Sequence, residues 1–389
     1  MRVTISGRAV FVEDPNLMRW AVISVVLATA SLPLPGQEMV HTVRWDPDTL
    51  VLIKQDGGYG RIVRLDDGRL LCAFSLGRQV HCCGSSDEGR TWSPAIRLTD
   101  YQHGVATNAD AITLADGTVL IGYNGRPDDG RAPFTIEVVR SSDGGKTWST
   151  PEVLFAAGMS AEEGCWEPAF LQLPDGEVHV YFANEAPYSR SNEQEISLTC
   201  SGDGGRSWSA PRAVSFRAGH RDGMPVPMLL ADRTTVLVAI EDNGLRGRMK
   251  PVFVSTSVAE NWSAGPVSGG SAHRWDPLSG ALPRRIYAGA PYICRTVAGH
   301  TVLSFQFRSE HRKPGDWSTT YAVVSVGQGD GKRFGSLSHP FAAFGNPRSI
   351  WNSVFAKGKR TVTLVSSAFI RGVSGLWAID GVVVPVNGE

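Results

Sequence analysis

The segment SSDEGRTWS at residues 85–93 recurs almost unchanged further along the chain, as SSDGGKTWS at residues 141–149 and SGDGGRSWS at residues 201–209. Each copy places Ser, Asp, Gly, Ser or Thr, and Trp at the same five positions. The Asp carboxylate can accept backbone N–H bonds within a tight turn, the Gly can adopt a positive φ, and the Trp ring can plug the gap between neighbouring strands. We therefore expect each copy to be a structural clasp. A decayed fourth copy at residues 255–263 keeps Trp262.

A second repeat consists of an apolar strand, a short turn and another apolar strand. It occurs six times, with turns at residues 67–68, 116–117, 175–176, 232–233, 298–299 and 357–358, which are 49 to 66 residues apart. A period of this length in an all-β chain indicates propeller blades. We predict an all-β fold, a six-bladed β-propeller of four-stranded blades. Segments 43–54 and 375–384 flank the blades, and we expect them to share the sixth blade and close the ring.

The composition limits the possible partners. The 389 residues contain 38 Lys and Arg against 38 Asp and Glu, so the formal net charge is zero. Binding to nucleic acid or to an anionic membrane needs a surplus of positive charge. Hydrophobic residues make up 42% of the chain, which is enough for a packed core. We expect a monomer that binds neither nucleic acid nor membrane.

The N-terminal residues read as a leader. From Met18, one Arg precedes an apolar run of about ten residues, and Ala28-Thr29-Ala30 fits a small-x-small cleavage site. The run is too short to span a bilayer, so we predict a signal peptide that starts at Met18 and is cleaved between Ala30 and Gly36. Residues 1–36 then form the leader, residues 37–389 form one propeller domain, and the protein is secreted or periplasmic.

The six cysteines give no sign of a metal or redox site. They are Cys72, Cys82, Cys83, Cys165, Cys200 and Cys294, and no C-x-x-C pair occurs among them. We predict that most are buried as small apolar side chains, and that the protein needs no metal and no cofactor.

Strand direction predicts where a binding site would form. In a blade the first strand lies nearest the axis and the second returns beside it, so starts of first strands and ends of second strands open on one face. First-strand starts carry Tyr59, Arg61, Asn108, Asp110, Trp166, Glu167, Asp222, Met224, Pro291, Tyr292, Trp351 and Asn352. Second-strand ends carry Arg78, Asn124, Arg126, Asn184, Glu185, Glu241, Asp242, Asn243, Gln306 and Arg308. Amides, charges and aromatic rings together are typical of a carbohydrate site.

Two glutamates are the candidate catalytic pair, because cleavage of a glycosidic bond usually needs two carboxyl groups. Glu167 has apolar neighbours at a strand start, where partial burial would keep its carboxyl protonated as a general acid. Glu241 ends an apolar strand at the same face and suits a nucleophile. Glu185, Asp110 and Asp222 compete for either role. The expected substrate contacts are Arg61, Asn108, Asp110, Asn124, Trp166, Asp222, Tyr292, Gln306 and Trp351.

The first repeat is the Asp-box of the sialidase-like β-propellers, which the chain resembles over nearly its whole length after the leader. More specifically, it resembles the exo-α-1,5-L-arabinanases, glycoside hydrolase family 93. The segments that carry this resemblance are 165–170, 181–185, 221–227, 239–242, 289–292 and 303–306. The resemblance implies a retaining enzyme that releases arabinobiose from linear arabinan, with Glu167 as general acid/base and Glu241 as nucleophile. The expected partner is thus an oligo- or polysaccharide.

Two other functions remain open. An exo-sialidase would use three arginines to bind the sugar carboxylate; Arg61 fits the first, and Arg126, Arg221 and Arg308 are the remaining candidates. The proline that follows the first arginine in sialidases is replaced by Val63. A non-catalytic Asp-box propeller that only binds its ligand would keep the boxes, and its two glutamates would be incidental.

Overall fold

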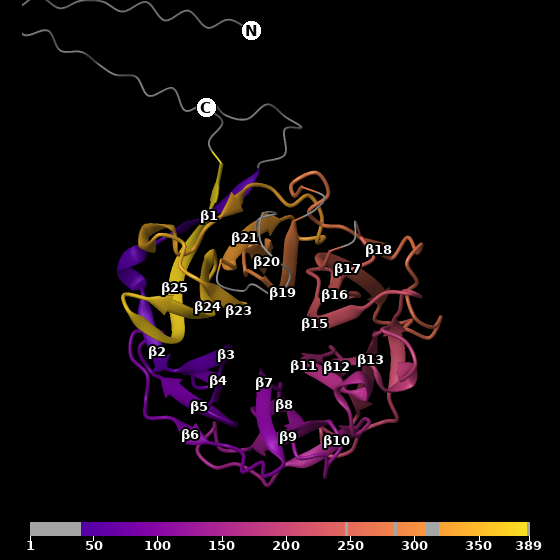
Figure 1. Cartoon of the computed structure of the whole chain (residues 1–389). Helices are drawn as coiled ribbons and strands as arrows, with labels where there is room; N and C mark the ends of the chain where they lie inside the picture. Colours follow the sequence, from indigo (N-terminus) through magenta and orange to yellow (C-terminus); the bar gives the residue numbers. More distant parts are fainter. Residues whose placement is uncertain (1–39, 246–247, 284–285, 309–318, 387–389) are drawn as a thin grey trace, which may run out of the picture. The chain divides into compact units, whose positions relative to one another are not determined.

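A computed structural model describes residues 40–245, 248–283, 286–308 and 319–386. It shows six antiparallel sheets arranged in a ring, with the first strand of each sheet nearest the axis (Figure 1). The six-bladed all-β prediction is confirmed. The predicted leader and its cleavage site lie outside the described residues. Within those residues no helix has the length and apolar character needed to cross a membrane.

Five blades have four strands in chain order from the axis outward. Blade 1 is β3 Gly57–Arg64, β4 Leu70–Leu76, β5 Gln79–Ser85 and β6 Ile96–Arg97. Blade 2 is β7 Gly104–Thr113, β8 Val119–Pro127, β9 Thr135–Ser141 and β10 Glu152–Ala156. Blade 3 is β11 Cys165–Gln172, β12 Val178–Asn184, β13 Glu195–Ser201 and β14 Arg212–Ser215. Blade 4 is β15 Asp222–Leu229, β16 Thr235–Asp242, β17 Lys250–Ser257 and β18 Arg274–Trp275. Blade 5 is β19 Tyr287–Arg295, β20 Thr301–Arg308, β21 Tyr321–Gly327 and β22 Leu337–Ser338.

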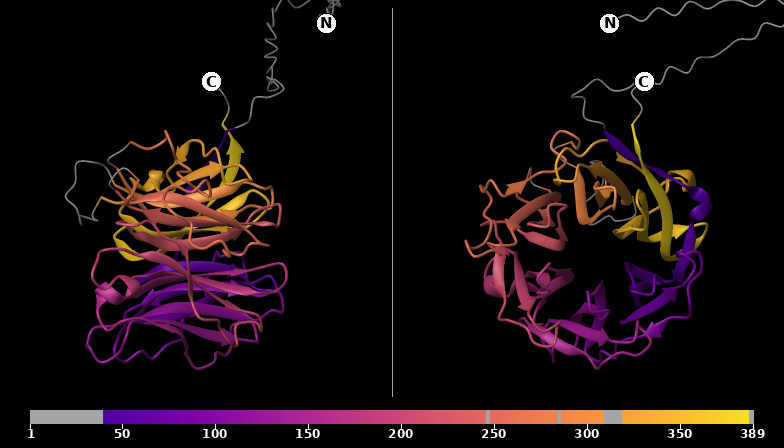
Figure 2. Two further views of the ribbon diagram at one scale, coloured as in Figure 1. Left: turned by 90° about the vertical axis from the view of Figure 1, so that its right-hand side faces the viewer. Right: turned by 180° about the vertical axis from the view of Figure 1, so that it is seen from behind.

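Blade 6 closes the ring with strands from both ends of the chain, as predicted. Its inner strands are β23 Ser349–Ala356, β24 Thr361–Ile370 and β25 Val373–Pro385. The N-terminal strands β1 His41–Trp45 and β2 Val51–Gln55 pair one after the other with the same edge of β25. β1 pairs with Pro385 to Gly381, and β2 pairs with Ala378 to Gly375. The 3-10 helix η1 Pro47–Thr49 interrupts them. Figure 2 shows the resulting ring from the side and from behind. Three further single-turn 3-10 helices lie in loops, at Ala161–Glu163, Ala186–Tyr188 and Ala342–Phe344.

The core of the molecule lies between the blades. Six apolar clusters of buried residues each combine side chains of two neighbouring blades, so every seam of the ring has its own core. Five of the six cysteines are buried in these seams, and Cys294 is partly buried. The prediction that they act as small apolar side chains is confirmed for these positions.

The three Asp-boxes form the predicted clasps after the third strand of blades 1, 2 and 3. In the first box, Asp87 accepts hydrogen bonds from the Thr91 backbone N–H and the Thr91 hydroxyl, at 2.9 and 2.6 Å, and from the Ser85 hydroxyl at 2.8 Å. These bonds stabilise the ionised carboxylate and lower the pKa of Asp87 to about 2. Gly89 has a φ of 80°. The same bonds recur around Asp143 and Asp203.

The Trp side chains of the boxes are less enclosed than we expected. Trp92, Trp148 and Trp208 are all partly exposed, because each box lies at the outer edge of its seam. Trp262 of the decayed copy is 3% exposed, and its indole N–H donates to the Tyr181 hydroxyl at 3.1 Å. Of these four tryptophans, Trp262 is therefore the one that fills a seam completely.

We predict that Trp262→Ala lowers the free energy of unfolding by about 3–5 kcal/mol, because it leaves a large cavity between blades 3 and 4. Trp148→Ala should cost less, because solvent already reaches its ring. Urea denaturation of both variants measures the difference. Equal losses would contradict this packing account, and so would a fall in kcat without a loss of stability.

Candidate active site

The first strand of every blade carries the same local distortion. In β3, two residues, Tyr59 and Gly60, face Phe74 alone on β4, because the strand register shifts between Gly58 and Arg61. The first residue of this β-bulge has a positive φ. The six equivalent residues are Tyr59, Asn108, Glu167, Met224, Ala290 and Trp351, with φ between 47° and 56°. Left-handed backbone is unfavourable for residues other than glycine and accumulates at functional sites.

These six bulge residues converge on the axis. Tyr59, Met224 and Ala290 form one buried cluster with Trp351 packed against it, although they come from blades 1, 4, 5 and 6. Beside this cluster lies a cavity of about 220 Å³, lined by four bulge residues and their neighbours. Its lining residues are Gly58, Tyr59, Ser75, Thr107, Asn108, Arg126, Glu167 and Trp351. The bulges thus turn side chains of six separate strands into one axial site.

Side chains from the preceding blade hold the bulges in place. The Glu167 backbone N–H donates to Asn124 Oδ1 at 2.7 Å, and the Trp351 N–H donates to Gln306 Oε1 at 3.0 Å. The Tyr59 N–H donates to Ser367 Oγ at 3.0 Å, and the Ala290 N–H to Glu241 Oε2 at 2.8 Å. Each acceptor faces the residue just before the bulge of its own blade. We call these four contacts the bulge clasps.

Asn124 is therefore a support for Glu167 rather than part of the cavity wall. It is fully buried, and its amide N–H group also donates to the Cys165 carbonyl at 2.7 Å. One amide thus fixes the backbone on both sides of Trp166. Gln306 has the same role at Trp351, and its amide group donates to the Tyr287 hydroxyl at 2.8 Å.

Glu167 is set up as a protonated carboxyl group. Burial, together with the negative charges of Glu241 and Glu185, raises its pKa to about 7. The Arg126 guanidinium, 3.6 Å from Glu167 Oε1, opposes these effects. Arg126 itself lies 4.7 Å above the Trp166 ring. The carboxyl lies on the wall of the axial cavity, where a general acid needs to be.

Glu241 lies beside two groups that stabilise its carboxylate form. Burial raises its pKa, but the Ala290 N–H and the charge of Arg221 stabilise the ionised form. Its Oε2 and the Tyr287 hydroxyl lie 2.7 and 2.3 Å from the point where a Cβ on Gly289 would stand. A side chain at position 289 would therefore displace both groups. Glycine leaves room for the carboxylate to approach the backbone of blade 5.

Burial raises the pKa of both carboxyl groups, to about 7 for Glu167. The charge of Arg221 opposes this shift at both groups, Arg126 opposes it at Glu167, and the Ala290 N–H opposes it at Glu241. The charge of Glu241 also raises the pKa of Glu167, so the two groups titrate as an interacting pair. A carboxyl group that keeps its proton to near neutral pH beside a second carboxyl group is what a general acid and its nucleophile or base require.

The structure places two competing carboxylates in ion pairs. Glu185 forms a two-bonded pair with Arg221, at 2.6 and 3.0 Å, and accepts the Trp166 indole N–H at 2.6 Å. Asp222 is completely buried and bonds to Arg274, which also binds Asp242. Because these carboxylates are neutralised by arginine, neither is free to act as an acid or a nucleophile.

Three other predicted contacts form the floor beneath the cavity. Arg61 is 3% exposed, and its guanidinium lies between the rings of Tyr59 and Tyr292, at 4.0 and 4.7 Å. Asp110 accepts hydrogen bonds from the Phe170 N–H at 2.9 Å and from the Tyr292 hydroxyl at 3.4 Å. Burial raises the pKa of Asp110 to about 6. Arg61 and Asp110 thus both contact Tyr292.

Of the nine predicted substrate contacts, Asn108 and Trp351 line the cavity with Glu167. Trp166 packs edge-on against Phe134 and beside Arg126. The remaining six support the site from the clasps, the floor or the buried ion network described above. Sequence reasoning did not single out Ser75 or Thr107, whose hydroxyls bond at 2.9 Å on the cavity wall, or Tyr287 beside Glu241. Tyr59 and Arg126 belong to the predicted face of the site but are not among the nine predicted substrate contacts.

A possible metal-binding group in the described part of the chain is Glu177, His179 and Cys200, whose ligand atoms lie within 4.8 Å of one another. Both ring nitrogens of His179 already have partners, Glu177 at 2.6 Å and the Tyr181 hydroxyl at 3.0 Å. The Arg212 guanidinium lies 3.7 Å from Cys200 Sγ, where it would repel a cation. We therefore interpret this group as a polar contact in the seam between blades 3 and 4.

Solved structures with the same fold include glycosidases of fungi. The GH93 α-L-arabinofuranosidase of Fusarium graminearum, solved with arabinobiose, matches with a TM-score of 0.66 and 18% identity, over 88% of this chain and 98% of that chain. The α-L-arabinanase of Penicillium chrysogenum, also solved with arabinobiose, matches with a TM-score of 0.64 and 18% identity, over the same shares of the two chains. At this identity the likeness establishes a shared fold.

Two matches rest on sequence. A sialidase of Micromonospora viridifaciens is 33% identical over 115 residues, which are 25% of this chain and 18% of that protein. The family model for the BNR repeat-like domain matches residues 60–180 and 127–367, which together cover most of the propeller. The chain therefore belongs to the family of proteins with a BNR repeat-like domain.

Proposed function

We propose that the protein is a retaining glycoside hydrolase in which Glu167 is the general acid/base and Glu241 the nucleophile. The observation that carries this proposal is a pair of neighbouring buried carboxyl groups. Glu167 lines the axial cavity with its pKa raised to about 7, and Glu241 accepts the N–H of the bulge residue Ala290 and has Arg221 as a positive partner. In the first step Glu241 attacks the anomeric carbon and the C–O bond to the leaving sugar breaks, while Glu167 protonates that oxygen. In the second step Glu167 removes a proton from water, which displaces Glu241.

We propose linear α-1,5-arabinan as the substrate and arabinobiose as the product. The resemblance to family 93 supports this, and so does the fold shared with two enzymes solved with arabinobiose. The axial cavity of about 220 Å³ is smaller than the ~300–1,000 Å³ typical of sites for drug-sized ligands. A small cavity walled by aromatic rings suits the end of a chain, which favours exo action.

A sialidase is the second candidate because of the match to the Micromonospora enzyme. Binding of the sialic acid carboxylate requires arginines that are free to reach it. Arg61 is stacked between two tyrosines, and Arg221 is paired with Glu185. Arg126 faces Glu167, and the Arg308 guanidinium lies 5.1 Å from the Tyr287 ring centre. These positions favour a neutral sugar.

The substrate can be tested directly with a panel of linear arabinan, branched arabinan, sialyllactose and rhamnosyl-glucuronate glycans. We expect linear arabinan to be cleaved with arabinobiose as the first product, detected by chromatography. Release of sialic acid would reject the arabinan proposal in favour of the second candidate. No cleavage of any glycan would favour the non-catalytic propeller.

The two glutamates should differ in their response to the leaving group. Glu241→Gln should abolish turnover of all substrates, because no glycosyl-enzyme can form. Glu167→Gln should slow cleavage of a sugar leaving group about 10²–10⁴-fold, but aryl glycosides with a good leaving group far less, because these need little protonation. Steady-state rates on both substrate types measure the difference. Equal losses on both types for Glu167→Gln would remove it from the acid role.

The pH dependence of kcat/KM should be bell-shaped. Glu167 has to be protonated, so activity should fall as the pH rises through about 7. Glu241 has to be ionised, so activity should also fall as the pH drops through its raised pKa. Because Arg126 lowers the pKa of Glu167, Arg126→Gln should move the basic limb to higher pH, and Arg126→Lys should leave it nearly in place. A basic limb that does not move in Arg126→Gln would contradict the assignment of Glu167.

The clasp on Glu167 should matter for turnover. Asn124→Ala frees the Glu167 backbone, and a displacement of the acid by about 1 Å should lower kcat about 10²-fold. Ser367→Ala removes the equivalent clasp from Tyr59 and serves as the matched control, with its effect mainly on KM. If Asn124→Ala lowers the melting temperature but leaves kcat unchanged, the clasp is only structural.

A further inference from the structure

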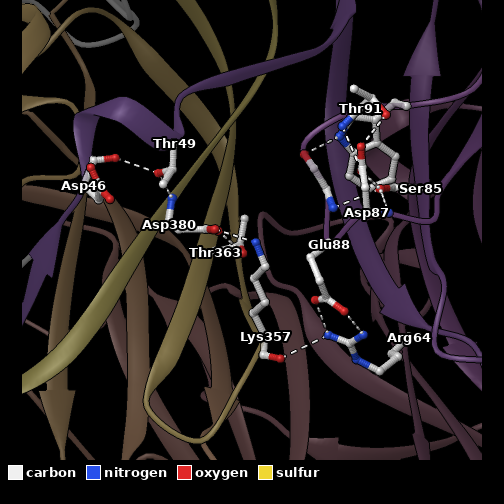
Figure 3. Close-up of polar contacts among 12 residues, drawn as sticks. Asp46, Thr49, Arg64, Ser85, Asp87, Glu88, Thr91, Lys357, Thr363 and Asp380 are labelled. Atoms are coloured by element: carbon white, nitrogen blue, oxygen red, sulfur yellow. Dashed lines mark hydrogen bonds and ion pairs between the residues drawn. The ribbon is translucent and has the colours of Figure 1, made fainter.

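A second cavity lies away from the axial site, between blades 6 and 1. It has a volume of about 550 Å³, more than twice that of the axial cavity. Its walls come from the first Asp-box, the turn between β23 and β24, and the short helix η1 (Figure 3). The box follows a third strand and the turn follows a first strand, so both lie on the face opposite the axial site.

One side-chain difference distinguishes the seam around this cavity from three other seams. At the seams entering blades 2, 3 and 5, a leucine of the preceding blade fills the space beneath a glycine. The leucines Leu71, Leu120 and Leu237 lie 2.6, 2.9 and 2.7 Å from a Cβ built on Gly145, Gly205 and Gly331. The equivalent residue of blade 6, counted from the bulge pairing, is Thr363. A Cβ on Gly89 meets only Trp92 and Leu70 of its own blade. The space that leucine fills at the seams entering blades 2, 3 and 5 is therefore open at the seam between blades 6 and 1.

The inner wall is apolar and the outer wall is charged but balanced. Ile62, Leu70 and Ala378 are buried at the inner wall, and the Trp92 ring also lines the cavity. The indole N–H of Trp92 is already bonded to the Gly89 carbonyl at 3.1 Å. Trp92 can therefore offer its ring to a ligand, but not this donor.

The charged groups neutralise one another in pairs across the two blades. Arg64 binds Glu88 through two bonds of 2.8 and 2.9 Å and donates to the Lys357 carbonyl at 3.1 Å. Lys357 Nζ in turn binds Asp380 Oδ2 at 2.5 Å. In Figure 3 the bond from Arg64 to the Lys357 carbonyl joins the Glu88–Arg64 pair to the Lys357–Asp380 pair. At the mouth, the exposed Asp48 and Arg90 again carry one charge of each sign.

We propose that this cavity is a second, non-catalytic carbohydrate site that binds a neutral sugar unit. A sugar ring has an apolar C–H face that suits Trp92 and the inner wall, and hydroxyl groups that suit paired carboxylates and cations. The balanced charge disfavours an anion or a cation as ligand. If the proposed function is correct, the sugar belongs to the same arabinan chain, and the site holds the polymer on the face opposite catalysis.

Tryptophan-specific ¹⁵N labelling allows both sites to be observed in one experiment. The Trp92 indole N–H reports the seam cavity and the Trp351 indole N–H reports the axial site; each resonance is assigned by substitution with Phe. The protein is full-length Glu241→Gln, which prevents turnover. The probes are arabinotriose, galactobiose and xylobiose. Thr363→Leu fills the seam cavity with the side chain found at other seams, and Asp48→Ala/Arg90→Ala removes two exposed polar groups at its mouth.

We expect saturable shifts of the Trp92 resonance with at least one neutral sugar, weakened about tenfold or more by Thr363→Leu. If Thr363→Leu does not fold, the Asp48→Ala/Arg90→Ala variant takes its place, and it should also weaken binding. A Trp92 resonance that does not respond to any of the three sugars overturns the proposal, as does an equal response in parent and variants. A response of Trp92 without a response of Trp351 supports the second site but contradicts the proposed arabinan site. A response of Trp351 without a response of Trp92 supports the proposed arabinan site and overturns the second site.

Discussion

The left-handed bulge in each innermost strand is the constraint on which the rest of the site depends. A bulge inserts one extra residue and turns its side chain out of the regular alternation of the strand. Six such bulges direct Tyr59, Asn108, Glu167, Met224, Ala290 and Trp351 toward the axis of the ring. Because left-handed backbone is costly for these residues, it needs support from outside the strand. At four of the six bulges a clasp from the preceding blade supplies that support, so the site geometry depends on how neighbouring blades pack.

Glu241 connects the scaffold with the proposed chemistry. It holds the Ala290 backbone at the position where Asn124 and Gln306 hold Glu167 and Trp351, yet it alone among the clasping side chains carries a charge. The N–H group that it clasps also favours its ionised form, and the charge of Glu241 in turn raises the pKa of Glu167. In the proposed mechanism, a structural position that neutral side chains occupy elsewhere in the ring thus supplies the nucleophile.

The sequence was sufficient to predict the fold and the face of the site, because both follow from local patterns. Alternating strands, Gly turns and Asp-boxes are short-range signals, and strand direction decides which residues share a face. The exact contacts depended on pairs far apart in the chain. Asp222 is bound by Arg274, and Arg61 lies between Tyr59 and Tyr292. The bulges were also hidden, because YG, NA, EP, MP, AP and WN share no residue type at their first position. For this reason strand position alone predicts substrate contacts at Asn124 and Gln306, whereas in the structure both side chains are clasps.

The stereochemistry of the first product tests the central claim most directly. Proton NMR during the first minutes of hydrolysis shows the anomeric configuration of the released sugar before it equilibrates in water. If Glu241 forms a glycosyl-enzyme and Glu167 then activates water, the first product has the configuration of the substrate. A first product of inverted configuration would mean that water attacks directly from a wider gap between the carboxyl groups, and it would contradict the assignment of Glu241 as the nucleophile.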